Sequence, residues 1–182
     1  MTIIDKLDFL RSQGGESATK GLDDQKLLDF ASHDPRLEEA VDAALASFAE
    51  LKQTQPDLIA MDEAGQAAEV QTGFINFYPE DAVCPYVSLA AKGPWIVTLK
   101  GAVLYECGGY GMLGFGHAPD QVLEAMNAPH VMANIMTPNV SQKRFFNAMN
   151  REIGHTRGGN PYSAMFCLNS GSEYVTLAAR IS

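Results

Sequence analysis

The stretch Met165–Glu173, which reads Met-Phe-Cys-Leu-Asn-Ser-Gly-Ser-Glu, constrains the fold of this chain more than any other segment. An apolar run ends at Leu168, a turn of glycine and serine follows, and an apolar helical pattern comes after it. This order predicts a buried strand at Ala164–Leu168, a tight bend, and a helix that begins near Gly171. A helix N-terminus carries unpaired N–H groups and a partial positive charge, and both features attract phosphate.

Two interpretations of this bend remain open. In the first, Gly171 lets the backbone approach a phosphate closely, and Ser170 and Ser172 add hydroxyl donors. In the second, Ser170 and Glu173 form the capping box S-x-x-E and satisfy the helix N–H groups themselves. The bend is neither a P-loop nor a nucleophile elbow, because Gly-Lys-Ser/Thr and G-x-S-x-G are both absent.

Charge and composition exclude several classes of partner. The net charge is −9 and no basic run exists, which argues against nucleic acid and anionic membranes. The sequence predicts neither a membrane span nor a signal peptide. Cys84, Cys107 and Cys167 have no metal-binding spacing, and free thiols favour a cytoplasmic protein.

Several helices and one hairpin follow from local patterns. The sequence predicts a short helix near Ile3–Leu10 and a strong helix opened by Asp34-Pro35, with Asp34 as its cap. It predicts a weaker helix over 57–72, a hairpin of Trp95–Leu99 and Ala102–Glu106, and a helix from Pro119. Ser141 is expected to cap a further helix that ends before Gly158-Gly159. In the Asp34 helix, apolar residues recur every three or four positions and predict one apolar face: Leu37, Val41, Leu45 and Phe48.

The segment after the hairpin is rich in glycine, with five glycines between residues 108 and 116. Such a backbone either turns sharply or approaches another group closely. From about residue 119 the expected order is helix, helix, strand, helix, which suits the opening of an α/β domain whose sheet is mostly missing.

Taken together, these motifs resemble the class III pyridoxal-phosphate-dependent aminotransferases. The resemblance covers roughly residues 93–182. It rests on Gly101-x-x-Leu-Tyr-Glu106, Gly109-Tyr110, Gly116-His117, Pro119 and Glu124-Ala125, and then on Asn169-Ser-Gly-Ser-Glu173 with Ala178-Ala-Arg180. It implies an α/β fold, the incomplete N-terminal portion of a PLP-dependent transferase of fold type I. The implied divisions are a helical extension (1–70), a hairpin with a glycine-rich loop (71–118), and the start of the large PLP-binding domain (119–182).

The resemblance also implies roles for individual residues. Ser170, Gly171 and Ser172 would hold the phosphate of pyridoxal 5'-phosphate, and Tyr110 would line the substrate pocket, although Tyr110 also fits simple packing on the hairpin. We expect a structural role for His117 and a capping role for Glu173. Arg144 and Arg157 are expected to be solvated helix charges rather than ligands of a substrate carboxylate.

Two departures from the family pattern stand near these motifs. Tyr174-Val175 replaces the usual small residue and Asn or Asp, and the turn Gly116-His-Ala-Pro119 is one residue short. A Schiff-base lysine is also missing, since the last of the seven lysines, Lys143, precedes the bend. We therefore assign no catalytic residue and expect the chain to be part of a longer enzyme, inactive by itself.

For that longer enzyme, the resemblance implies amino transfer between an amine or amino acid and a keto acid or aldehyde, in a homodimer. Two alternatives stay open: a non-catalytic fragment that binds a phosphorylated small molecule, and another PLP enzyme of the same fold, such as a mutase or decarboxylase.

Overall fold

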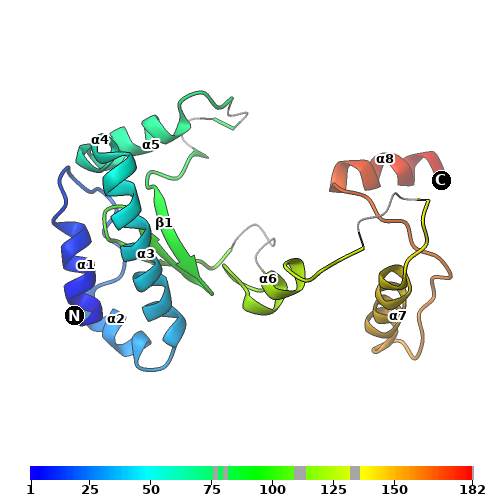
Figure 1. The fold of residues 1–182 in the computed structure, drawn as a ribbon. Helices are drawn as coiled ribbons and strands as arrows, with labels where there is room; N and C mark the ends of the chain where they lie inside the picture. Colours follow the sequence, from blue (N-terminus) through cyan, green and yellow to red (C-terminus); the bar gives the residue numbers. More distant parts are fainter. Residues whose placement is uncertain (76–77, 80–81, 109–113, 132–135, 182) are drawn as a thin grey trace. The chain divides into compact units, whose positions relative to one another are not determined.

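The computed structural model describes residues 1–75, 78–79, 82–108, 114–131 and 136–181 (Figure 1). The chain divides into two compact units, Met1–Ala128 and Pro129–Ser182, and each is considered by itself. The first unit contains α1 (Ile3–Arg11), α2 (Asp24–Ala31), α3 (Pro35–Thr54), α4 (Pro56–Ala60), α5 (Glu63–Gln71), β1 (Ser88–Lys92), β2 (Trp95–Thr98), β3 (Val103–Tyr105) and α6 (Asp120–Met126). The second contains α7 (Val140–Gly154) and α8 (Gly171–Ile181).

Local signals start the helices of the first unit. The Asp34 side chain accepts a hydrogen bond from the Arg36 amide, and Pro35 occupies the first turn of α3, as the sequence predicts. A capping box between Thr2 and Asp5 begins α1. The predicted helix over 57–72 is instead two helices, because Asp62 caps α5 through the Gly65 amide and separates it from α4.

The strands form one antiparallel sheet in the order β1-β2-β3. The hairpin of β2 and β3 is confirmed, and Trp95 pairs with Tyr105 across it. Strand β1 was not predicted from the sequence. It pairs with the edge of β2 that faces away from β3, and Lys92 lies opposite Trp95. The central position of β2 buries all four of its residues.

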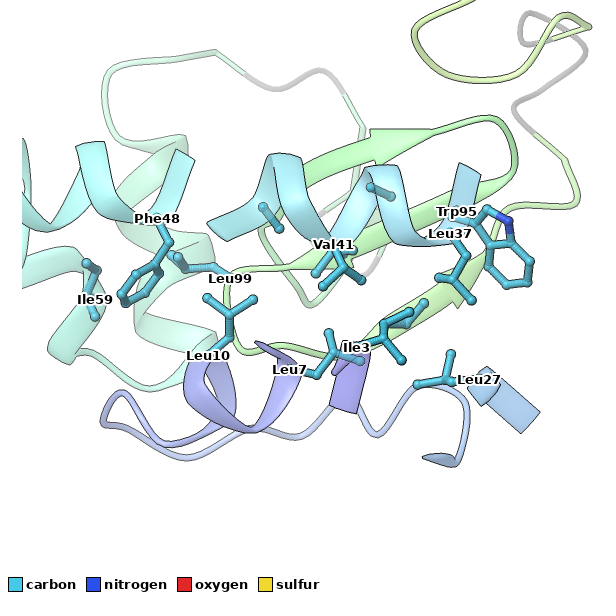
Figure 2. Close-up of a cluster of buried hydrophobic side chains, with 14 of the residues drawn as sticks. Ile3, Leu7, Leu10, Leu27, Leu37, Val41, Phe48, Ile59, Trp95 and Leu99 are labelled. Atoms are coloured by element: carbon cyan, nitrogen blue, oxygen red, sulfur yellow. The ribbon is translucent and has the colours of Figure 1, made fainter. Parts of the chain in front are cut away.

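Helix α3 lies against β1 and β2 and packs on α1, so the core forms between the helices and the sheet. Figure 2 shows side chains of α1, α3 and β2 pointing toward one another. The predicted apolar face of α3 is confirmed, since Leu37, Val41 and Phe48 are buried and Leu45 is partly buried against the same core. The main fully buried side chains are Leu7, Leu10, Leu27, Leu37, Val41, Phe48, Trp95, Val97 and Val103.

The coarse α/β expectation is therefore confirmed as a mixture of helices with a small antiparallel sheet. The helices of residues 1–60 and the hairpin share one core, and the boundary between compact units falls after Ala128. The predicted division at 70 and 118 stays a prediction for a longer protein. Among the described residues, no helix combines the length and apolar character needed to cross a membrane.

The second unit differs from its predicted form in two respects. Residues 164–168 form no strand, because no other described segment pairs with them. Helix α7 is capped by Asn139, whose side chain and that of Gln142 form a capping box, and not by Ser141. No described residue from 129 to 181 is buried, so this unit has no core of its own.

Candidate functional site

The candidate site is the bend formed by residues 169–173 at the start of α8. The Ser170 hydroxyl Oγ accepts a hydrogen bond from the Glu173 amide at 3.3 Å. The Glu173 carboxylate oxygen Oε2 accepts from the amides of Asn169 and Ser170 at 3.0 and 3.2 Å. These bonds make the capping box that the sequence offered as the structural interpretation, and they confirm the capping role of Glu173.

The same bend leaves donors available. Among the described residues, no partner accepts from the amides of Gly171 and Ser172, or bonds to the Ser172 hydroxyl. Ser170, Gly171 and Ser172 are exposed, and a Cβ placed on Gly171 would meet no atom within 4 Å. An anion can therefore approach two amides at the positive end of an 11-residue helix.

Glu173 sets the electrostatic condition for anion binding. Its carboxylate already occupies the Asn169 and Ser170 amides, so a phosphate at the bend would meet a like charge. Anion binding at the bend is strongest when the Glu173 side chain turns away and releases the Asn169 and Ser170 amides. The residues present thus fit a phosphate group, with Glu173 as its competitor.

A cavity of about 410 Å³ lies along α8. Its walls include Ser172, Thr176 and Arg180 from the helix, together with Phe166 and Leu168 from the segment that precedes it. The cavity therefore begins beside one of the serines of the bend and follows the helix toward a cationic side chain.

Tyr174 holds that preceding segment against α8. Its hydroxyl accepts from the Leu168 amide at 3.0 Å and lies 3.4 Å from the Phe166 carbonyl, to which it donates. The Tyr174 hydroxyl thus bonds two backbone groups of a segment that no described strand pairs. Helical and strand patterns do not predict this role, because the contact joins a helix residue to a non-helical segment.

The glycine-rich segment is described only in part. Tyr110, the predicted substrate-pocket residue, lies outside the described residues. His117 exchanges two backbone hydrogen bonds with Gly93, at 2.7 and 2.9 Å, so it joins the segment to the turn between β1 and β2. This contact agrees with the structural role expected for His117.

Metal-binding clusters and reactive cysteines are the other features of the described residues that could carry chemistry. No group of three or more His, Cys, Asp or Glu residues there is arranged to hold a metal ion. Cys84, Cys107 and Cys167 are free and exposed. Arg144 and Arg157 are exposed, in line with the expectation of solvated charges. Comparison with known proteins adds nothing to this site, since no family model, curated protein or solved structure matches the chain.

Proposed function

We propose that this chain is the N-terminal part of a PLP-dependent aminotransferase of class III and that the bend at the start of α8 holds the cofactor phosphate. The observation that carries the proposal is the pair of open amides of Gly171 and Ser172 at that helix N-terminus. Ser170 and Ser172 would supply hydroxyl donors. Charge-assisted hydrogen bonds of this kind contribute about 1.5–3 kcal/mol each.

The second unit supports the idea of a larger domain. No described side chain between 129 and 181 is buried, although Phe145, Phe166 and Val175 are at least half exposed. Apolar surface on this scale normally lies against further structure, as in an α/β domain with a central sheet. The fold type I architecture is part of the proposal for that larger domain.

In the complete enzyme, the cofactor would act as an electron sink for amino transfer between an amine or amino acid and a keto acid or aldehyde. The residues of this chain would anchor the phosphate and orient the cofactor, and Tyr110 would line the substrate pocket. We propose a cytoplasmic location, in keeping with the three free cysteines. The homodimer is proposed from the resemblance to the aminotransferases. No residue of this chain is assigned to proton transfer.

A titration that compares pyridoxal 5'-phosphate with pyridoxal tests the phosphate site. The chain should bind the phosphorylated compound weakly and pyridoxal at least about tenfold more weakly, which corresponds to one lost charge-assisted hydrogen bond.

Replacing Ser172 by alanine should weaken phosphate binding, whereas Glu173→Gln should strengthen it by removing the like charge. The exposed Ser163 offers a matched Ser→Ala control away from the bend. Equal affinity for both compounds would refute the phosphate site.

The alternative of a non-catalytic phosphate binder is separated by inorganic phosphate and an unrelated phosphate monoester. If both bind the bend as well as pyridoxal 5'-phosphate does, the site recognises phosphate alone, and the aminotransferase assignment loses its support. A mutase or decarboxylase of the same fold would share the bend and differ in its products.

A further inference from the structure

A second cavity lies in the first unit, beside α5. Its volume is about 700 Å³, which is within the usual range for sites that bind small molecules. Alanines at one-turn spacing on α5 form one wall: Ala64, Ala67 and Ala68. Because alanine side chains are short, this helix face leaves room for another molecule. The lining also includes Phe74, Tyr78 and the segment Val83–Pro85.

Glu63 is the acidic group in the wall of this cavity. It is the first residue of α5 and only 2% exposed. Its oxygen Oε2 accepts from the amides of Ala18 and Thr19 at 2.8 and 2.7 Å. Its other oxygen, Oε1, is buried and has no hydrogen-bond partner among the described residues. A buried carboxylate oxygen without a donor is unusual, because its desolvation is not compensated.

The nearby cation does not satisfy Glu63. The Lys100 ammonium interacts electrostatically with Glu63, but it donates its hydrogen bonds to the carbonyls of Gly14, Ile59 and Met61. No ion pair of Glu63 is present among the described residues. One acceptor of this buried carboxylate therefore has no donor, in a residue that lines the cavity.

We propose that this cavity binds an organic ammonium ion, with the cationic head on Glu63 Oε1 and an apolar body against the alanine face of α5. A carboxylate attracts the cation and accepts its N–H groups, and aromatic faces such as those of Phe74 and Tyr78 add favourable cation–π interactions. The inference is independent of the proposed function, since the cavity and the bend belong to different units.

The test uses the chain of 182 residues and two probes of equal length, hexylammonium and hexan-1-ol. Calorimetric titration measures the affinity of the chain for each probe. Hexylammonium should bind at least about tenfold more tightly, as expected for one hydrogen bond between charged groups. Glu63→Gln keeps an acceptor for the Ala18 and Thr19 amides but removes the charge, so the affinity for hexylammonium should fall to that of the alcohol.

Two further variants keep the test decisive. Glu69→Gln makes the same exchange at an exposed residue of α5 and should leave both affinities unchanged. Ala67→Leu places a larger side chain in the cavity and should weaken both probes, even if Glu63→Gln fails to fold. The proposal is overturned if the two probes bind equally, if neither binds, or if Ala67→Leu has no effect.

Discussion

The indole Nε1 of Trp95 donates a hydrogen bond to Asp34 Oδ2 at 2.9 Å and joins the first residue of β2 to the cap of α3. Asp34 also holds the Arg36 guanidinium through two hydrogen bonds of 2.8 Å. One carboxylate thus starts the longest helix and fixes it to the central strand. The bond with Arg36, and then that with Trp95, lowers the pKa of Asp34 from 3.8 to about 2.

This pKa shift predicts a pH dependence of stability. Asp34 has a lower pKa when folded, so its contribution is complete above its unfolded pKa near 3.8 and is lost as the pH falls through about 2. Asp34→Asn should reduce the loss of stability over that range, as measured by urea unfolding at a series of pH values. At neutral pH, Asp34→Ala should cost about 1 kcal/mol or more through the lost cap alone.

Asp57 provides the control for this experiment, because it is exposed at the start of α4, where no side chain caps the helix. Asp57→Asn should leave the pH profile unchanged. Identical profiles for Asp34→Asn and the unaltered chain would contradict the role given to Asp34.

Lys100 is expected to stabilise the first unit from inside. It is 5% exposed, and its ammonium donates to three backbone carbonyls, those of Gly14, Ile59 and Met61. Burial lowers the pKa of this lysine. Lys100→Met keeps the apolar stem but leaves the carbonyls without a donor, so the unfolding free energy should fall by about 2 kcal/mol or more. Lys20→Met, at an exposed lysine, should change it little.

Gly116 should tolerate no side chain, unlike its neighbour Gly114. Its φ is +75°, and an added Cβ would lie 2.9 Å from the backbone of Gly93. Gly116→Ala should therefore strain the contact between Gly93 and His117 and cost about 1–3 kcal/mol. A Cβ on Gly114 would meet nothing within 4 Å, so Gly114→Ala is the matched control. Thermal unfolding of both variants gives the comparison, and equal midpoints would contradict the prediction.

The two units should differ in hydrogen exchange. Interior amides of α3 lie over a buried core and should exchange only through global unfolding, whereas α8 has no buried residue from 171 to 181 and should exchange through local opening. Mass spectrometry of exchanged peptides tests this difference. Equal protection of α3 and α8 in the isolated chain would contradict this prediction, because it would require stabilising contacts around α8 that its exposed side chains do not show.

Local sequence was sufficient where one short segment contains the whole signal. Asp34-Pro35 specifies the start of α3, and Lys100-Gly101 specifies a turn in which Gly101 has a φ of +71°. In the candidate site, Ser170 and Glu173 predicted the capping box. These structures depend on residues within about four positions of one another, so the sequence could reveal them without knowledge of the fold.

Other features depend on contacts between distant segments. The alanine-containing sequence of β1 has little strand propensity, and it becomes a strand because β2 pairs with it and α3 covers it. The apolar residues 164–168 have the composition of a strand but no described partner, and their backbone groups turn to the Tyr174 hydroxyl. The sequence by itself therefore determined where α1 and α3 begin and where the hairpin turns. The tertiary structure decided which extended segments form a sheet, because a strand requires hydrogen bonds from another part of the chain.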